Sequence, residues 1–449
     1  MQRTDAGPAG FPLAELRHAV DSGITAWLER GGSGAAASDA LAAAHRWALS
    51  PPGKLLRPIT LLASAGAVGG SYDAVMPAAV GIELAHVATL VHDDIIDGDE
   101  LRRGKVAAHR EFGLAHGVLA ADSLFFALFQ QLGGCRRTGV PDRCVLDAVE
   151  ALGAAGQQTA RGVAQEIALS GSLREVTAPP DGGIAAYVEM ARLKSASLFR
   201  AACHVGALLG GGSPERARVL AAYGEAMGIA FQIRDDLLPY VSDGEGAGKP
   251  VCSDLRNRRP ALPVLLAHRL GGRAERAALA ELVDGTTDER ARRRRLTRLA
   301  VDTGALRAAQ SMARAYVDRC HRALAPVPAG ADRDRLAWLA DEVAGTAYDR
   351  DDGHGYGRDE VRGGGDVVGH GHGDDRGHGH GDGPDDGRDR GRGRGPEPDR
   401  GRRVDPERDH APDRGHSPDR GHSPDPAPDP VAEAATGGLR TARPGGDRP

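Results

Sequence analysis

Hydrophobic residues recur at steps of three and four over most of the first 348 positions of this chain. That spacing matches one face of an α-helix, whose turn takes about 3.6 residues. The pattern is longest in residues 12–31, 72–97, 116–132, 185–211 and 214–238. Clusters of Gly, Pro and Ser separate these windows, and no comparable segment alternates as a β-strand would. The pattern therefore predicts an all-α fold for this part of the chain.

Several predicted helices consist largely of alanine and other small apolar residues. Such helices are typical of a bundle whose central members are covered on all sides by others. The arginine run at 292–295 is different, because it follows the acidic, polar stretch at 284–290. We interpret this run as the solvated face of a helix rather than as a nucleic-acid contact.

The composition changes close to Tyr348. From Asp349 onward Gly, Asp, Arg, His and Pro dominate, Tyr356 is the only aromatic residue and Leu439 the only leucine. Such a segment cannot bury enough apolar surface to offset the entropy lost on ordering. We therefore expect a helical domain over residues 1–348 and a disordered tail over residues 349–449.

Charge and cysteine usage narrow the class of protein. The formal net charge is -5 for 449 residues, and aspartates interrupt the arginines of the tail, so we expect no nucleic-acid partner. The front of the chain lacks a signal-peptide pattern, and Glu83 and His86 interrupt the most apolar stretch, so we expect no stable membrane insertion. The cysteines are five in number and include no CxxC pair, which favours a reduced, cytoplasmic protein.

Two acidic clusters close long apolar helix patterns. In the first, Asp93 and Asp97 lie about 40° apart around the helix, with Asp94 beside them. The second contains Asp235 and Asp236. Like charges this close repel each other unless a cation neutralises them. Carboxylate ligands favour hard cations, and Mg²⁺ is usually held by one or two carboxylates together with substrate phosphates.

Cationic residues accompany both clusters, namely Lys54, Arg57, Arg102, Arg103, Lys194, Lys249 and Arg259. Arginine offers a fork to phosphate oxygens, and lysine offers a compact charge. Any one of them alone would be interpreted as a surface ion pair. Their number around two acidic clusters favours a site for a polyphosphate substrate.

These segments together resemble the trans-isoprenyl diphosphate synthases, or polyprenyl synthetase family. The segments that carry the resemblance are GKLLRP, ELAHVATLVHDDIIDGDELRRG, HREFGLAHGVLAAD, YVEMARLKSASLF and FQIRDDLL followed by GKPVCSDLRNRRPALP. They occur in the family's order over roughly residues 13–347. The resemblance implies an all-α, isoprenoid-synthase-type helical bundle around a central cavity, usually a homodimer. It also implies head-to-tail condensation of isopentenyl diphosphate with an allylic diphosphate.

The resemblance also implies roles for individual residues. Asp93, Asp97 and Asp235 would hold about three Mg²⁺ ions on the allylic diphosphate, with support from Asp94 and Asp236. The residues implied to bind that diphosphate are Arg102, Lys194 and Lys249. Those implied to bind isopentenyl diphosphate are Lys54, Arg57, His86 and Arg103. Arg259 retains a cation that the resemblance implies in substrate binding. Gln232, Ser195 and the Lys194 carbonyl would face the developing allylic cation.

The chain departs from the family's pattern at three places. Pro239 stands where the second cluster commonly ends in aspartate, and we expect the helix to end there. Val163, ahead of Glu166, stands where glutamine is frequent. Arg258 and Arg259 replace the usual Gly-Lys, which alters the geometry of the cation.

Product length should depend on the residues between the first cluster and the cavity floor. Ala88 and Thr89 are small where family members that stop at fifteen carbons tend to carry an aromatic residue. Geranylgeranyl diphosphate or a somewhat longer product is therefore expected. Phe125, Phe126 and Phe129 on the next helix form either a lower floor or ordinary core.

Two alternatives remain open from the sequence. A class I terpene cyclase shares an all-α cavity and an acidic cluster, but it has no use for a second diphosphate site. A partner-docked homologue, of the kind carried as cargo in encapsulin shells, would use residues 349–449 to bind a protein partner or shell, which is compatible with activity.

Overall fold

The computed structural model describes residues 13–30, 40–170, 173–179, 181, 183–241, 261–284 and 289–345. All of them belong to one compact unit. Apart from one short hairpin, the secondary structure of these residues is helical, which confirms the predicted all-α class. The boundary predicted at residue 348 and the tail at 349–449 lie outside the described residues.

The N-terminal half is arranged around α4, which spans Tyr72–Asp97 and packs against α3, α6, α1 and α10. Its N-cap is Ser71, and Gly98 ends the helix in the left-handed conformation that glycine adopts readily. The bounds agree with the hydrophobic window 72–97. The other helices of this half are α1 (Leu13–Glu29), α2 (Ala40–Leu49), α3 (Leu56–Gly66), α6 (Leu114–Arg137) and α7 (Asp142–Ala168).

A hairpin follows α4 directly. Its strands are β1 (Leu101–Arg102) and β2 (Lys105–Val106), which pair antiparallel with Arg102 opposite Lys105. A short helix, α5 (Ala108–Glu111), leads from the hairpin into α6. These two-residue strands are too short to show hydrophobic alternation, so the sequence pattern did not reveal them.

The window 185–211 folds into three consecutive segments rather than one α-helix. They are α9 (Ile184–Ala191), a π-helix η1 (Arg192–Ala196) and α10 (Ser197–Leu209). The next helix, α11 (Pro214–Val241), packs along α10 and α16 and also contacts η1. A π-helical segment widens the turn locally, and such segments are frequent at functional sites.

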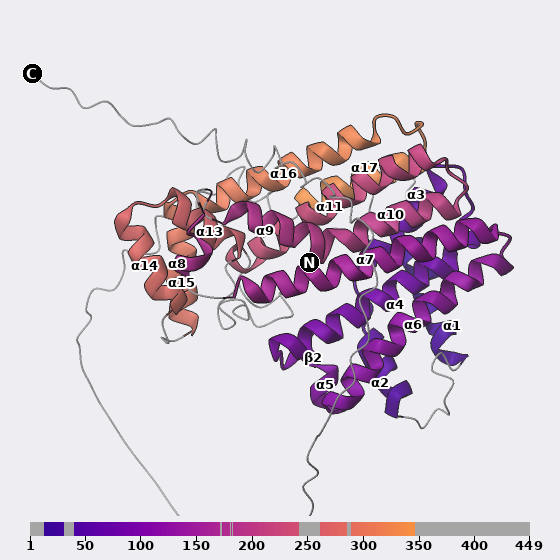
Figure 1. The fold of residues 1–449 in the computed structure, drawn as a ribbon, viewed down its shortest axis with the longest axis horizontal. Helices are drawn as coiled ribbons and strands as arrows, with labels where there is room; N and C mark the ends of the chain where they lie inside the picture. The colour runs from indigo at the N-terminus through magenta and orange to yellow at the C-terminus, as the bar shows by residue number, and fades with distance from the viewer. Residues whose placement is uncertain are drawn as a thin grey trace, which may run out of the picture. The chain divides into compact units, whose positions relative to one another are not determined.

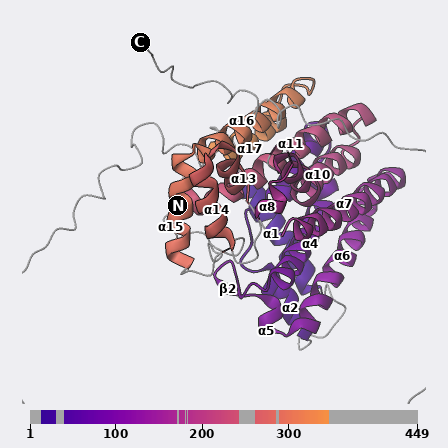
Figure 2. The same ribbon diagram turned by 60° about the vertical axis from the view of Figure 1, so that its left-hand side comes forward.

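The remaining helices cover α11 and close one end of the bundle. They are α8 (Leu173–Val176), α13 (Leu262–Leu270), α14 (Arg273–Asp284), α15 (Glu289–Asp302), α16 (Ala305–Leu324) and α17 (Ala331–Gly345). Figure 1 shows α4, α6, α7, α10, α11 and α16 running roughly side by side, with α8, α13, α14 and α15 grouped at the left. Figure 2 shows the same group and, below it, the hairpin with α2 and α5.

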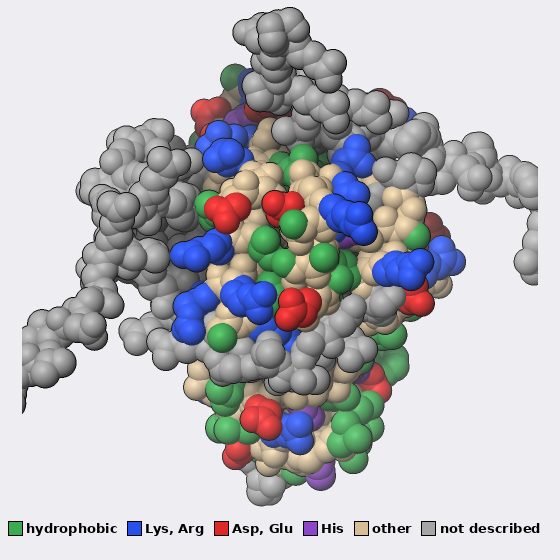
Figure 3. Space-filling view, turned by 90° about the vertical axis from the view of Figure 1, so that its left-hand side faces the viewer, with side chains coloured by type: hydrophobic (Ala, Val, Ile, Leu, Met, Phe, Trp, Pro, Cys, Tyr) green, Lys and Arg blue, Asp and Glu red, His purple; other side chains and the backbone are tan. Residues whose placement is uncertain are grey.

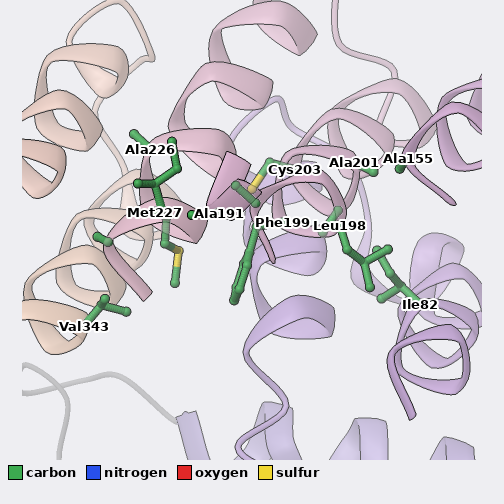
Figure 4. Close-up of a cluster of buried hydrophobic side chains, with 14 of the residues drawn as sticks. Ile82, Ala155, Ala191, Leu198, Phe199, Ala201, Cys203, Ala226, Met227 and Val343 are labelled. Atoms are coloured by element: carbon green, nitrogen blue, oxygen red, sulfur yellow. The ribbon is translucent and has the colours of Figure 1, made fainter. Parts of the chain in front are cut away.

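The core lies where α10 meets its neighbours. Figure 4 shows Phe199 and Cys203 of α10 between Met227 of α11 on one side and Ile82 of α4 on the other. All four side chains are buried. Burial of large apolar side chains here fixes α4, α10 and α11 against one another, and the carboxylate clusters lie at the ends of α4 and α11.

Two helices are long and apolar enough to cross a membrane by length and composition, α4 and α6. In α4, 67% of the apolar window is buried inside the protein, and in α6 44% is. The apolar character of α4 is therefore explained by its central place in the bundle. That of α6 is explained only in part, because α6 also has an exposed apolar face.

Candidate active site

A cavity of about 920 Å³ lies where the last turns of α4 and α11 meet η1, α7 and the loop before α3. Most of the predicted site residues line it, and they are Lys54, Arg57, His86, Asp93, Asp97, Arg102, Arg103, Lys194, Ser195, Gln232, Asp235 and Asp236. Asp94 is not among its lining residues. Lys249, Arg258 and Arg259 lie outside the described residues. Figure 3 views the molecule from the end at which α4 and α11 finish, where basic and acidic side chains lie around hydrophobic ones.

The aspartates of the first acidic cluster point in two directions. Asp93 and Asp97 lie on the cavity side of α4, as their spacing predicted. Asp94 is 2% exposed and turns toward the hairpin instead. Nε of Arg102 donates hydrogen bonds to both oxygens of Asp94, at 2.7 and 3.0 Å. Asp94 therefore holds Arg102 at the cavity, and any support that it gives to a metal site is indirect.

The hairpin turn brings two arginines to the cavity. Its central residues, Arg103 and Gly104, have φ values of 51° and 77°. Two positive φ values are the signature of a type I′ turn, which normally takes Asn-Gly. Arginine has no short side chain to favour this conformation, so its presence is explained by the position of its guanidinium. Nη1 of Arg103 donates to the carbonyl of Pro51 at 2.8 Å, which ties the turn to the loop before α3.

A second set of contacts fastens the hairpin to α2. Nε1 of Trp47 donates to the carbonyl of Val106 at 2.9 Å, and Nζ of Lys105 donates to the carbonyl of Trp47 at 2.9 Å. Nζ of Lys105 also lies 4.2 Å from the centroid of the Trp47 ring, a cation–π contact. The sequence analysis missed both residues, although Lys105 directly follows the RRG motif.

Lys194 is held over the first cluster by the π-helix. Its Nζ donates to Glu166 at 2.6 Å and lies 3.8 Å from Asp93. Burial alone would lower the pKa of Lys194, but Asp93, Glu166 and Asp97 outweigh it and raise that pKa above its ordinary value. Lys194 therefore stays charged at neutral pH.

A glycine allows α7 to approach the π-helix this closely. A Cβ at Gly162 would stand 2.3 Å from the backbone nitrogen of Lys194, well inside any contact that real side chains make. Because the position has no side chain, the backbone of α7 lies directly against η1. This close approach sets the position of Lys194.

The second acidic cluster is organised by hydrogen bonds along α11. Ser195 donates to Oε1 of Gln232, and Nε2 of Gln232 donates to Asp236 at 2.9 Å. The other oxygen of Asp236 accepts a hydrogen bond from the backbone N–H of Leu262 at 3.0 Å. Asp235 is exposed toward the cavity. Asp235 thus faces the cavity, whereas Asp236 anchors the start of α13.

A second group of cations lines the cavity before and along α3. Arg57 stacks over the Phe199 ring, with Cζ 4.3 Å from its centroid, and lies 3.1 Å from Nε2 of His86. Burial lowers the pKa of Arg57 to about 10. Burial also lowers the pKa of His86 well below its usual value, and Arg57 and Arg103 lower it further. His86 is therefore neutral at pH 7, and its Nε2 accepts the hydrogen bond from Arg57.

Glu83 is a site residue that the sequence analysis did not assign. It is 3% exposed, lines the cavity one turn before His86, and its Oε2 has no hydrogen-bond partner among the described residues. Burial raises the pKa of Glu83, and the charges of Arg57 and Arg103 oppose that rise. A carboxylate inside an otherwise apolar helix, on the face of His86, was the signal that could have identified it.

Two predictions about local structure are corrected here. The helix does not end at Pro239, because α11 continues to Val241. Proline removes only its own N–H donor, so the helix can continue for two residues beyond it. The Pro239 carbonyl accepts a hydrogen bond from Nη2 of Arg293 at 2.8 Å. The same contact shows that Arg293 is not part of a solvated face, although Arg294 and Arg295 are exposed as predicted.

The phenylalanines of α6 do not share one environment. Phe126 is 70% exposed and Phe129 41% exposed, so neither forms a cavity floor or ordinary core within this chain. Phe125 is half-buried, packs on the core and lies 5.8 Å from the His92 ring. Neighbouring helix positions point about 100° apart, which explains why Phe125 and Phe126 differ.

The donor set of the cavity fits a hard divalent cation. Asp93, Asp97 and Asp235 supply only carboxylate oxygens, from two helix ends that face one another across the cavity. Within the described residues no three Asp, Glu, His or Cys side chains converge closely enough to hold a metal by themselves. That combination fits Mg²⁺, which protein carboxylates usually bind together with substrate phosphates.

Comparisons with known proteins agree with this geometry. A family model described as polyprenyl synthetase matches residues 38–299. A geranylfarnesyl diphosphate synthase from Aeropyrum pernix is 36% identical over 293 residues, which are 65% of this chain and 89% of that protein. A geranylgeranyl diphosphate synthase from Methanosarcina mazei is 37% identical over 228 residues, which are 51% of this chain and 67% of that protein.

Solved structures show the same fold. The crystal structure of a polyprenyl synthase from Caulobacter crescentus, complexed with calcium and isoprenyl diphosphate, superposes with a TM-score of 0.66 at 32% identity. The match covers 75% of this chain and 97% of that one.

Proposed function

Because this chain belongs to the polyprenyl synthetase family, we propose that its cavity condenses isopentenyl diphosphate head-to-tail with an allylic diphosphate. The chain is a trans-prenyltransferase of isoprenoid biosynthesis. One observation carries the assignment of roles: two carboxylate-bearing helix ends and a separate group of cations, Lys54, Arg57 and Arg103, line the same cavity. Two diphosphates need two such sites, whereas a terpene cyclase needs only one.

The allylic diphosphate is assigned to the side of Asp93, Asp97 and Asp235. These carboxylates would hold Mg²⁺, about three ions by family resemblance, and the bound metal would offset the charge that develops on the leaving diphosphate. Lys194, which stays charged through Asp93 and Glu166, and Arg102, which Asp94 orients, contribute fixed positive charge on the same side. Lys249 is proposed here by family resemblance alone.

Isopentenyl diphosphate is assigned to the side of Lys54, Arg57 and Arg103. The cation–π contact with Phe199 and the hydrogen bond with His86 hold Arg57 in one orientation, so little side-chain entropy remains to be lost on binding. His86 serves as a neutral acceptor that orients Arg57. Arg259 is proposed to bind substrate by resemblance alone.

The residues between the two sites guide the reaction. The C–O bond of the allylic diphosphate breaks, and its electron pair leaves with the diphosphate. The double bond of isopentenyl diphosphate then attacks the allylic carbon, and the new cation loses a proton to the released diphosphate. Ser195 fixes the Gln232 amide beside the reacting carbons, where its dipole can stabilise positive charge. The surrounding apolar residues exclude water that would otherwise capture the cation.

The product is geranylgeranyl diphosphate or a longer chain, in line with relatives described as geranylgeranyl and geranylfarnesyl diphosphate synthases. We propose geranylgeranyl diphosphate as the principal product. Thr89 lines the cavity, and Ala88 is fully buried beside it. Neither carries an aromatic ring that would stop the chain at the level of Asp93.

A homodimer is proposed from the exposed apolar face of α6. Leu119, Phe126 and Phe129 are 56%, 70% and 41% exposed and recur at helical spacing. Leu146 of the neighbouring α7 is 64% exposed. Large exposed apolar residues grouped in this way are typical of a protein interface.

A cytoplasmic location is proposed, because both proposed substrates are charged small molecules and most of the apolar window of α4 is buried inside the protein. A protein partner or shell that binds residues 349–449 is a further proposal, from sequence alone. Deletion of these residues should leave turnover intact and abolish partner capture. Equal capture by full-length and truncated protein would exclude a docking role for this segment.

Product analysis tests the proposed function. Purified protein is incubated with Mg²⁺, isopentenyl diphosphate and, separately, C5, C10, C15 and C20 allylic diphosphates, and the dephosphorylated products are sized by mass. A discrete C20 or longer prenyl alcohol is expected. A cyclised hydrocarbon formed without isopentenyl diphosphate would instead identify a cyclase.

A further inference from the structure

Arg234 is a buried cation that none of the assignments above uses. It lies on α11 directly before Asp235, lines the cavity and is 6% exposed. Its Nε has no hydrogen-bond partner, and within the described part of the chain no hydrogen bond or ion pair reaches its guanidinium. A buried guanidinium without an anion is costly, so its retention at a cavity wall indicates an anionic ligand there.

The neighbour of Arg234 indicates which side of the cavity that ligand occupies. Burial lowers the pKa of Lys54, and among the nearby charges Arg234 contributes most to lowering it further. Both residues line the same cavity, so the two like charges share one wall of the site. Lys54 is exposed at the cavity, and its ammonium has no acceptor among the described residues. Two such cations fit a ligand with more than one negative charge, as a diphosphate has.

On the allylic side of the cavity the cations already have carboxylate partners. There Lys194 has Glu166 at 2.6 Å and Asp93 at 3.8 Å, and Arg102 has Asp94. On the opposite side Glu83, Asp235 and Glu342 act on the charges of Arg57 or Lys54, but no ion pair joins a described residue to Lys54 or Arg234. Consecutive residues of a helix point about 100° apart. One turn of α11 can thus present Asp235 to the metal side and Arg234 to the other.

We propose that Arg234 binds the diphosphate of isopentenyl diphosphate together with Lys54 and Arg57. The inference rests on the proposed function, because it assumes that this side of the cavity receives isopentenyl diphosphate. It adds a residue from α11 to a site whose other residues come from the loop before α3, from α3 and α4, and from the hairpin. The helix that carries Asp235 then contacts both substrates.

A structural role is the competing explanation. Glu342 of α17 lines the same cavity and acts on the charge of Lys54, so Arg234 could serve only to balance this carboxylate. No ion pair joins Arg234 to Glu342 in the described structure. The two roles predict opposite effects on the protein without substrate. Removing a structural cation would lower the melting temperature, whereas removing an uncompensated one would leave it unchanged or raise it.

The test uses the full chain with Arg234→Gln, Arg234→Lys and, as a matched control, Arg218→Gln on the exposed face of the same helix. We expect Arg234→Gln to raise KM for isopentenyl diphosphate about 10- to 100-fold, with KM for the allylic substrate and kcat within about threefold of wild type. Arg234→Lys should recover part of the loss, and Arg218→Gln should behave as wild type. The melting temperature of Arg234→Gln without substrate should not fall.

Calorimetric titration with isopentenyl diphosphate alone separates this inference from the proposed function. Weaker binding to Arg234→Gln than to wild type, by about tenfold or more, supports the inference whether or not the protein turns over. Wild-type binding with no change in Arg234→Gln overturns it and leaves the proposed function standing. An equal rise in both KM values, or a lowered melting temperature with unchanged KM values, also overturns it. No binding and no prenyl product with wild type would overturn the proposed function itself.

Discussion

The carboxylate of Asp94 accepts hydrogen bonds from Nε of Arg102 at 2.7 and 3.0 Å, across the turn that joins α4 to the hairpin. Its neighbour Asp93 faces the cavity and Lys194 instead. Two adjacent aspartates of one motif therefore have different tasks. One belongs to the cavity, and the other belongs to the arginine that reaches it.

The division between these aspartates can be measured. Asp93→Ala and Asp235→Ala should each lower kcat by at least about 10³-fold with helix content unchanged, because both remove a proposed metal ligand. Asp94→Asn should retain measurable turnover and raise KM for the allylic substrate about tenfold, because Arg102 loses a charged partner. The Mg²⁺ dependence of Asp94→Asn should match that of wild type. Near-normal turnover of Asp93→Ala would contradict the assigned metal role.

The sequence predicted the long helices and many of the residues that line the cavity, but not the direction in which neighbouring side chains point. The bounds of α4 followed from its hydrophobic period and from Gly98. The direction of Asp94 depends on where the hairpin places Arg102, which is a matter of tertiary packing. The π-helix at Lys194 likewise depends on the approach of α7 at Gly162. The hydrophobic periodicity of residues 185–211 does not indicate a π-helix.

Arg234 and Phe126 show the same limit. Arg234 occurs inside an apolar window, where an isolated cation is indistinguishable from one at a helix surface until burial is known. The spacing of Phe125, Phe126 and Phe129 indicated a helix with apolar positions, but periodicity does not say which face the rest of the chain covers.

The glycine at 162 provides a test of the packing behind Lys194. Gly162→Ala places a Cβ 2.3 Å from the Lys194 backbone nitrogen, so α7 and η1 must separate. We expect a loss of about 1–3 kcal/mol in the free energy of unfolding and a raised KM for the allylic substrate. The matched control is Gly156→Ala on the same helix, where no atom lies within 4 Å. That variant should gain about 0.5–1 kcal/mol from helix propensity and keep its KM.

The neutral state of His86 predicts a pH dependence of stability. Its pKa lies well below the ordinary 6.5 in the folded protein because of burial and then of Arg57 and Arg103. The unfolded chain therefore binds more protons than the folded protein below about pH 6.5. The free energy of unfolding is highest above about pH 6.5 and decreases as the pH falls toward the folded pKa of His86. The decrease is at most about 1.4 kcal/mol per pH unit. Urea unfolding of wild type and His86→Gln between pH 5.5 and 7.5 measures this, and the variant should show a smaller slope.

Glu83 provides the internal check on that experiment. Its raised pKa contributes stability below about pH 4.5 that is lost as pH rises through the folded value, the opposite sign to His86. The contribution of Glu83 is common to wild type and His86→Gln. The difference between the two proteins therefore reports His86, and equal slopes would contradict the assignment of a neutral imidazole.

Thr89 gives a test of how the cavity limits the product. Its side chain lines the cavity and donates to the His86 carbonyl at 2.7 Å. Thr89→Phe would fill the space below Asp93 and should shift the product to C15, as measured by the mass of the dephosphorylated alcohol. Thr89→Val keeps the volume and should leave the product length unchanged. Full-length product from Thr89→Phe would show that the growing chain takes another path.

Phe126 tests whether a second copy of the chain covers the apolar face of α6. Because Phe126 is 70% exposed and contributes little to the packing of its own chain, Phe126→Glu should change folding stability by less than about 0.5 kcal/mol. A glutamate in the centre of a dimer interface would instead be desolvated without a partner, so the variant should shift to monomer in light scattering after size-exclusion chromatography. Phe126→Leu retains an apolar side chain and should remain dimeric. A wild-type protein that is monomeric at micromolar concentration, or a Phe126→Glu variant with unchanged mass, would mean that this face serves another contact.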